Sequence, residues 1–470
     1  MTVTGPMPPI ARRSPRRRVV VAGALAVLLA SAMLASSQGA PSALPPIRIG
    51  AVFPLSGSAA PLAQQTELGV RIAADLVNAD GGIEGRRVEL DVRDLERGAD
   101  APAVMASLRA AGANVVVGAY SSDLSIAASA AAADAGLVYW EAGAVADRLT
   151  GRGLPLVFRV GASGSNLGDN SARFAVTELA PRLDRAASAL RVAVVAADDE
   201  YARSVADAAR SALRSSGAPI VADLSYSLSL PRWPSLMARL AGARPDVIIL
   251  ASHIPDGVAF RRAMLAAHLH VSALIGSTMA ECDPDFAGDL GADAVGIFAS
   301  DRPTAGFRPS VLSPAARATY ARFADAWASA VGGQPAAAQP GDERYPPAAG
   351  EGSGDYAITG PQLVQRATDP TEEGLSGFAA AWALFRDVLP AAAGGDLAPA
   401  SIAAAARDLD MPEGSLPNGA GLRFSNDPAT LGQNQRATAV IWQWQAVRTY
   451  AFVWPAAYAT GPVAFVPLSR

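Results

Sequence analysis

Short apolar segments alternate with helix-like segments through much of this chain, and this alternation limits the fold more than any other feature. The first series has strand-like segments at 47–55 (IRIGAVFPL), 88–94 (VELDVRD), 113–120 (ANVVVGAY) and 136–140 (GLVYW), and helix-like segments at 63–78, 101–111 and 123–134. Strands that alternate with helices at this spacing predict βαβ units, and therefore a parallel sheet with helices on its faces.

The same pattern starts again in the middle of the chain. Strand-like segments follow at 191–197, 219–226, 245–252, 273–277 and 294–300, with helix-like segments at 201–215, 234–242, 257–267 and 283–289. Two series predict two similar α/β lobes, and VFRVGASGSNLGDN at 157–170 is the expected crossing between them. A cleft between two lobes is a natural place for a ligand.

The last third of the chain is less regular. Residues 309–331 and 374–389 are predicted to be helical, whereas the Pro-, Gly- and Ala-rich segment between them predicts a flexible surface insertion within 332–370. After Gly421, the runs LRFS, ATAVIWQWQA, TYAFVWP and GPVAFVP predict terminal strands. We therefore expect a first lobe of residues 46–160 and about 309–420, and a second lobe of residues 161–308 and about 421–470.

The first 43 residues differ from the rest and resemble an export signal with a spacer. A basic block, ARRSPRRR, precedes an apolar run at 19–35 and a small, proline-rich segment. This order predicts cleavage near Ala40 or Ala43, and the paired arginines are compatible with the twin-arginine route. The alternative is an uncleaved membrane anchor, because the apolar run is close to the shortest length that spans a bilayer. Both alternatives place the body of the chain outside the cytoplasm.

Composition excludes some classes of function. Half of the 470 residues are hydrophobic and the net charge is only −4, so the chain can bury a large core and has no basic surface typical of nucleic-acid binding. Cys282 is the only cysteine, which excludes an intramolecular disulfide and leaves no acceptor for a lipid after the apolar run. We expect Cys282 to be a structural thiol or part of a pocket wall.

Several motifs, in order, carry a resemblance to a known family. IRIGAVFPLSG, NADGGIEGRRVELDVRD, VVVGAYSS, GAVADRLTGRG, VFRVGAS and PDVIILAS, with the C-terminal GLRFS, GQNQRATAVIWQWQ and VWP, resemble the extracytoplasmic substrate-binding proteins of ABC importers for branched-chain amino acids, amides and urea. The resemblance covers about residues 46–331 and 374–456.

The resemblance implies a periplasmic binding-protein-like fold of type I, with three crossings between the lobes, no cofactor and no catalytic step. A ligand would bind between lobes that close by a hinge motion, and the closed form would be presented to a membrane permease and its ATPase. Because ligands of open parallel sheets bind beyond the carboxyl ends of the strands, the loops at these ends are the expected ligand contacts.

In the first lobe, the segment YSSD begins a helix, so that Ser121 or Ser122 could simply cap it. The resemblance implies instead that one of these hydroxyls, with the free N–H groups of the helix start, binds a carboxylate or carbonyl of the ligand. It also places Gly143, Ala144 and Val145 at the ligand.

Two positions depart from the pattern of the amino-acid binders. Val145 stands where those proteins have a threonine, and Thr278 stands where they have an acidic residue for the ligand's ammonium group. Glu141, Glu281 or Asp283 could compensate. The alternative is a ligand without an ammonium group, such as an amide or a urea-like compound.

The remaining candidates are aromatic or ionisable. Tyr120, Trp140 and Glu141 are similar to pocket residues of the amide and urea binders, and Tyr201 matches a tyrosine that recurs in the family, although a packed aromatic at a helix start is an equal alternative. His253 follows a strand where relatives often have an aromatic contact, and its simpler interpretation is a surface histidine.

Other functional classes lack support in the sequence. There is no G-x-S-x-G elbow, no P-loop lysine motif and no G-x-G-x-x-G after the first strand, which argues against an exported enzyme. His268 and His270 lie without cysteines or a carboxylate cluster nearby, so that no metal site is expected. A ligand-sensing receptor domain would need a separate signalling partner.

Overall fold

The computed structural model describes residues 44–57, 59–278, 280–281, 284–303, 307–332, 363–364, 369–394, 396–447 and 449–468, together with Met1 and Gly5. The chain divides into two units, Met1–Pro45 and Pro46–Arg470, and the second contains both sheets. The predicted export signal, Cys282, Asp283 and most of the predicted insertion at 332–370 lie outside the described residues.

The first lobe is built on a five-stranded parallel sheet in the order β2-β1-β3-β4-β5. Its strands are β1 (Ile47–Phe53), β2 (Val88–Asp94), β3 (Val115–Gly118), β4 (Val138–Glu141) and β5 (Val157–Arg159). The helices that connect them are α2 (Ala60–Ala79), α3 (Ala101–Ala110) and α4 (Ser122–Asp134). The parallel pairing of these strands confirms the predicted βαβ units. The apolar strands β1, β3 and β4 are buried on both faces, as is usual in parallel sheets.

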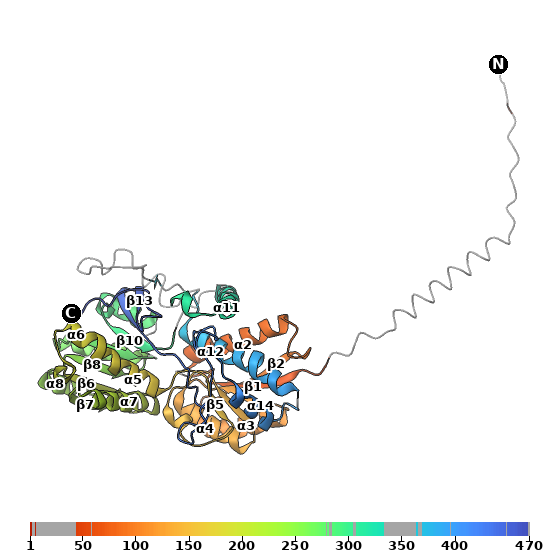
Figure 1. The fold of residues 1–470 in the computed structure, drawn as a ribbon, viewed down its shortest axis with the longest axis horizontal. Helices are drawn as coiled ribbons and strands as arrows, with labels where there is room; N and C mark the ends of the chain where they lie inside the picture. The colour runs from red at the N-terminus through yellow and green to blue at the C-terminus, as the bar shows by residue number, and fades with distance from the viewer. Residues whose placement is uncertain are drawn as a thin grey trace. The chain divides into compact units, whose positions relative to one another are not determined.

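Later segments complete the first lobe. These are α11 (Pro314–Gly332), α12 (Glu372–Ala383), α13 (Leu389–Ala393) and α14 (Pro399–Asp408). Figure 1 shows α12 and α14, in blue, among the orange elements of this lobe, and α12 packs along α2. The two helices touch at glycines: a Cβ on Gly69 would lie 2.1 Å from the carbonyl oxygen of Gly374, and one on Gly377 would lie 2.1 Å from that of Thr66.

The second lobe contains a larger, mixed sheet in the order β11-β13-β12-β10-β9-β8-β6-β7. Its parallel part comprises β6 (Val192–Ala197), β7 (Ile220–Tyr226), β8 (Val247–Ala251), β9 (Ala273–Ser277) and β10 (Phe298–Asp301). The antiparallel part comprises β11 (Leu363–Val364), β12 (Val440–Ala446) and β13 (Thr449–Trp454). Its helices are α5 (Gly164–Phe174), α6 (Ala180–Arg182), α7 (Glu200–Ser216), α8 (Trp233–Ala243), α9 (Ile254–Ala266) and α10 (Pro284–Leu290).

The chain leaves the first sheet after β5, returns to it after β10 and leaves it again before β12, which gives the three crossings expected of the fold. The last boundary differs from the prediction. Residues 421–436, predicted in the second lobe, contact the first sheet: Arg159 N–H donates to the carbonyl of Gly432 at 2.9 Å, and Asn434 N–H donates to that of Arg159 at 3.0 Å.

Two of the four predicted terminal strands are confirmed, as β12 and β13. The predictions for LRFS and GPVAFVP are wrong. LRFS makes only isolated bridges, through Leu422 and Phe424, and residues 461–467 form no strand. The latter segment instead bonds to the side chains of β12, since Gln443 and Gln445 donate to the carbonyls of Ala464 and Pro462.

Candidate functional site

The carboxyl ends of the two sheets meet where the lobes contact each other. Asp147, in the loop after β4, donates its backbone N–H to Ser204 Oγ of α7 at 2.9 Å. Its neighbour Arg148 forms an ion pair with Glu200 at 3.2 Å. The contact brings together the strand-end loops of both lobes, where ligands of such sheets are expected.

Glu141 organises the loops of the first lobe. Its side chain is fully buried, and its Oε1 accepts the backbone N–H groups of Gly143 and Ala144, both at 2.7 Å. Its Oε2 accepts the N–H of Ala119 at 3.1 Å and the hydroxyl of Tyr139 at 3.0 Å. Burial raises the pKa of Glu141, and the hydrogen bonds from its neighbours oppose this rise. Both oxygens are engaged, so Glu141 positions the loops that follow β3 and β4.

Trp140 was predicted to face the ligand, and the structure places it elsewhere. It packs with Phe158 and Phe424, with ring centroids 5.7 and 5.3 Å away, and its Nε1 donates to the carbonyl of Ala380 at 2.8 Å. Neighbouring residues of a strand point to opposite faces, so Trp140 enters the core of the first lobe while Glu141 points the other way. The structure therefore places Trp140 in the core of the first lobe and not at the loops that follow the strands.

The other first-lobe candidates do lie together. Tyr120 has a positive φ of 71°, and its ring covers Gly143, where a Cβ would lie 2.7 Å from Cδ2 of the ring. Ser122 Oγ accepts the N–H of Ala146 at 3.2 Å. Ser121 precedes α4, is partly exposed and makes no capping bond with its side chain. Ser121 is thus the hydroxyl of this pair that is available at the helix start.

Val145 and Arg302 connect this group to the rest of the molecule. The carbonyl of Val145 accepts the N–H of Gly164, the first residue of α5, at 2.6 Å, and its side chain is buried. Arg302, directly after β10, donates to the carbonyl of Gly143 at 2.7 Å and to Glu372 Oε2 at 2.8 Å. Both contacts join the loop after β4 to segments that cross between the lobes.

Tyr201 is the centre of the second-lobe group. It is buried at the start of α7, and its hydroxyl reaches the carbonyls of Ser252, at 3.3 Å, and Ser277, at 3.2 Å, and that of Thr278. Tyr201 therefore ties the ends of β8 and β9 together.

His253 stands at the N-terminus of α9 between two carboxylates. Its Nε2 lies 2.9 Å from Asp199, which caps α7, and its Nδ1 lies 3.7 Å from Asp256. Burial lowers the pKa of the imidazole, but Asp199 and Asp256 outweigh burial and raise this pKa to about 9. His253 is therefore a cation at neutral pH, and it contacts the edge of the Tyr201 ring at 5.3 Å between centroids.

Thr278 and Glu281 follow β9 and have unused hydrogen-bonding capacity, as do His253 Nδ1 and Trp442 Nε1 among the described residues of this lobe. Both side chains are fully buried, and neither Thr278 Oγ1 nor Glu281 Oε2 has a hydrogen-bond partner among the described residues. Glu281 Oε1 accepts from Ser252 Oγ at 3.2 Å. The carboxyl fits because residue 276 is glycine: a Cβ there would lie 2.1 Å from Glu281 Oε2. Gly276 lies in β9 and Thr278 directly follows this strand, so both unpartnered oxygens belong to residues at or just after its carboxyl end.

The charge of Glu281 follows from its surroundings. Burial raises the pKa of this carboxyl to about 8, so that it is mostly protonated at pH 7. A protonated carboxyl can both donate and accept a hydrogen bond. An uncharged polar group of a ligand would therefore suit it.

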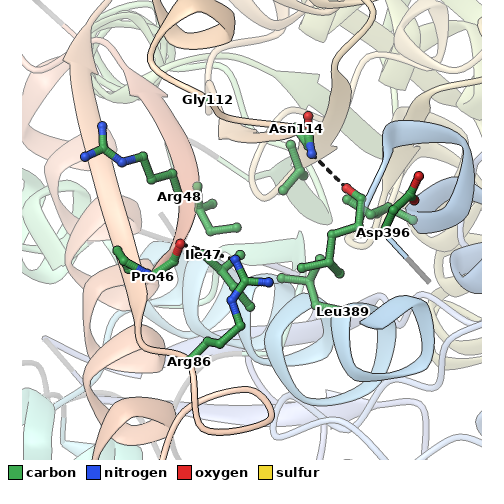
Figure 2. Close-up of a pocket in the computed structure, with 12 residues that line it drawn as sticks. Pro46, Ile47, Arg48, Arg86, Gly112, Asn114, Leu389 and Asp396 are labelled. Atoms are coloured by element: carbon green, nitrogen blue, oxygen red, sulfur yellow. Dashed lines mark hydrogen bonds between the residues drawn. The ribbon is translucent and has the colours of Figure 1, made fainter. Parts of the chain in front are cut away.

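A separate pocket lies at the opposite edge of the first sheet, where β1 and β3 begin (Figure 2). Its polar groups are used within the protein, since Asn114 Nδ2 donates to the carbonyl of Leu397 at 2.9 Å and Arg48 donates to that of Ala111 at 3.3 Å. We do not assign a ligand to it. Across the described part of the chain, no group of three or more His, Cys, Asp or Glu side chains could hold a metal ion, and no described helix is long and apolar enough to cross a membrane.

Sequence patterns brought out most of the strand-end loops but missed two residues that hold them. Arg302 bonds to Glu372, which is 70 positions later in the chain. Arg159 is buried, and its Nη1 donates to the carbonyl of Ala146 at 2.6 Å. No local pattern marks either arginine. The apolar strands that precede them are the only signal, because an arginine at a buried strand end needs a partner.

Comparison with known proteins agrees with this geometry. A family model described as periplasmic binding protein matches residues 46–345. The Leu/Ile/Val-binding protein homolog 8 of Brucella abortus is 27% identical over 430 residues, which cover 91% of this chain and 94% of that protein. The Leu/Ile/Val-binding protein homolog 7 of Brucella melitensis is 31% identical over 254 residues, which cover 53% of this chain and 63% of that protein.

Solved structures share the fold. The branched-chain amino acid transporter substrate-binding protein LivJ from Streptococcus pneumoniae, in complex with isoleucine, superposes with a TM-score of 0.64 at 21% identity, covering 87% of this chain and 100% of its own. A solute-binding protein from R. palustris, in complex with benzoate, gives 0.64 at 18% identity, covering 90% and 100%. Since the family model spans more than half of the chain and both sheets have the expected topology, the chain belongs to the periplasmic binding protein family.

Proposed function

We propose that this chain is the extracytoplasmic solute-binding component of an ABC-type importer. It binds a small polar organic molecule between its lobes and delivers this molecule to a membrane permease that works with an ATPase. The family supports a binding role, and the relatives named above include proteins for branched-chain amino acids and for benzoate. The proposed role involves no catalytic step.

The observation that carries the proposal is the pair of buried oxygens, Thr278 Oγ1 and Glu281 Oε2, that have no hydrogen-bond partner among the described residues. Leaving a polar group buried and unpaired costs about 1–3 kcal/mol, so such groups in a family of binding proteins indicate where a ligand bonds. The proposed contacts are Tyr120, Ser121, Ser122 and 143–145 in the first lobe, and Tyr201, His253, Thr278 and Glu281 in the second.

The ligand we propose has an uncharged polar group, such as an amide or a urea-like group. Val145 offers no side-chain hydrogen bond where a hydroxyl would serve an amino acid. Thr278 and a protonated Glu281 offer neutral donors and acceptors in place of a carboxylate. A ligand with an ammonium group would have to ionise Glu281 on binding, which weakens its affinity at neutral pH.

Thermal-shift screening of the chain without residues 1–43 tests the proposal, with amino acids, simple amides, urea and small carboxylates as the panel. Calorimetry of each hit follows, together with analysis for chemical turnover. We expect an amide or urea-like compound to give the largest shift. A larger shift with leucine, isoleucine or valine would contradict the proposed ligand class, and turnover of a hit would contradict the binding role.

A further inference from the structure

Two exposed leucines stand out on the second lobe. In the described part of Pro46–Arg470, the large apolar side chains that are exposed are those of Leu228, at 39%, and Leu230, at 66%. Both belong to the short segment 227–232, which connects β7 to α8. Single exposed apolar residues are common on protein surfaces, but two in one loop, with no others in the described body, form a local apolar surface.

A hollow lies beside this loop. It is lined by the end of β7 and by one face of α8, including Tyr226, Leu230, Leu236 and Arg239. Leu236 and Arg239 lie on the same face of α8, because residues three apart are neighbours on a helix surface, and Arg232 directly precedes this helix. The loop and the hollow together form one surface, which we call the β7–α8 surface.

This surface carries unbalanced positive charge. Arg232 and Arg239 are both exposed, and within the described residues neither has a carboxylate within 4.0 Å. Another arginine of this lobe, Arg210, pairs with Asp207 and Asp223. Two unpaired cations beside exposed leucines fit a partner that presents a carboxylate next to an apolar side chain.

The surface also lies at the edge of the sheet that carries the ligand loops. Leu228 N–H donates to Asp198 Oδ1 at 3.1 Å, and Asp198 directly precedes the residue that pairs with His253. Tyr226, which lines the hollow, donates its hydroxyl to Asp256, and Asp256 faces His253 from the other side. A partner on this surface would therefore contact the end of the second lobe that faces the ligand site.

We propose that the β7–α8 surface is a docking site for an extracytoplasmic segment of the permease, and that this segment carries an acidic residue beside an apolar one. The proposal rests on the proposed importer function. A lipid membrane fits less well, because two arginines provide little of the basic charge that anionic lipids attract, and a concave hollow suits a protruding side chain.

The test measures binding of the chain without residues 1–43 to lipid nanodiscs that hold a permease–ATPase complex of the proposed importer. Nanodiscs of the same lipid composition, one third anionic and without protein, serve as the second probe. The variants are Leu228→Ser with Leu230→Ser, and Arg239→Glu. Arg214→Glu is the matched control, since Arg214 is exposed in the last turn of α7, which leads to the beginning of β7, whereas the β7–α8 surface lies at the end of that strand.

We expect both variants to weaken binding to the complex at least tenfold, the control to bind as the parent protein does, and empty nanodiscs to bind none of them. Equal melting temperatures of all the proteins verify that the variants are folded. If the variants bind the complex as well as the parent protein, the docking site is wrong while the importer function stands. If the parent protein binds empty nanodiscs and the variants bind them less well, the partner of this surface is the lipid and not the permease. If the parent protein binds neither probe, the importer function itself fails.

Discussion

Replacing Glu141 by alanine tests whether this buried carboxyl holds the ligand loops in place. The backbone N–H groups of Gly143 and Ala144 donate to Glu141 Oε1 and would lose their acceptor. Ala119 N–H also bonds to Ser125 Oγ, at 3.1 Å, and keeps a partner. The Tyr139 hydroxyl loses its bond to Glu141 but is also hydrogen-bonded to Ser125. Two buried N–H groups without partners cost about 1–3 kcal/mol each. We therefore expect Glu141→Ala to lower the free energy of unfolding by about 2–6 kcal/mol.

Urea unfolding measures this loss, and two further variants separate its causes. In Glu141→Gln, the remaining oxygen can still accept from both loop N–H groups, so we expect a loss of about 1–2 kcal/mol. Glu178→Ala removes an exposed carboxylate that pairs with Arg182 one helical turn away, at 2.7 Å, and should cost about 0.3–0.5 kcal/mol. A loss for Glu141→Ala no larger than that for Glu178→Ala would refute the reasoning, as would equal losses for the alanine and glutamine variants.

Three further predictions concern packing and charge. Urea unfolding should show that Gly168→Ala destabilises the protein by more than 2 kcal/mol, roughly the cost of overpacking, because the new Cβ would lie 2.1 Å from a backbone oxygen of α7. The control is Gly242→Ala in α8, whose Cβ would meet open space and which should be neutral or stabilising. The pKa of Glu281 is about 8 in the folded protein against 4.5 in the unfolded chain, so the parent protein loses stability as the pH rises from about 4.5 to 8. Between pH 4.5 and 7, the free energy of unfolding of Glu281→Gln should therefore rise by about 3 kcal/mol relative to that of the parent protein. Parallel pH profiles of the two proteins would contradict this. NMR titration should give a pKa near 9 for His253 and a lower pKa in Asp199→Asn. The stability that this ion pair contributes is complete below about pH 6.5 and should be lost as the pH rises through 9. An unchanged pKa in the variant would show that Asp199 does not cause the raised pKa.

The two series of strands and helices could be predicted because their signals are local. A strand such as VVVG at 115–118 is apolar on both faces, and helices such as 200–216 show a regular apolar stripe, so each element declares itself within a few residues. The order of these elements then limits the topology to parallel sheets. The short C-terminal runs LRFS and GPVAFVP carry the same local signal, yet they are not strands. LRFS makes only isolated bridges, and residues 461–467 bond to the side chains of β12 instead of pairing with a strand.

The sequence predicts the site at the level of loops, and the structure decides where the side chains lie. The strand-end rule predicts the segments around Ser121, Gly143, Tyr201 and Thr278 as ligand loops. This rule does not say which face of β4 turns toward the core. Trp140 and Glu141 are neighbours on opposite faces, and the structure puts Trp140 in the core and bonds Glu141 to the loops. Trp140 and Glu141 are both polar-tipped residues next to a loop, and only the packing of Phe158 and Phe424 shows which of them turns inward.

By itself, the sequence determined the fold class, the two-lobed organisation and the edge of each sheet where a ligand would bind, because periodicity and strand order are written in consecutive residues. The tertiary structure decided which groups remain available at that edge. Loops of the first lobe donate hydrogen bonds to both carboxyl oxygens of Glu141. Glu281, in contrast, is buried beside Gly276, and one of its oxygens has no hydrogen-bond partner among the described residues. Hydrogen-bond satisfaction depends on neighbours that are distant in sequence, and for this reason no local pattern could distinguish the two glutamates.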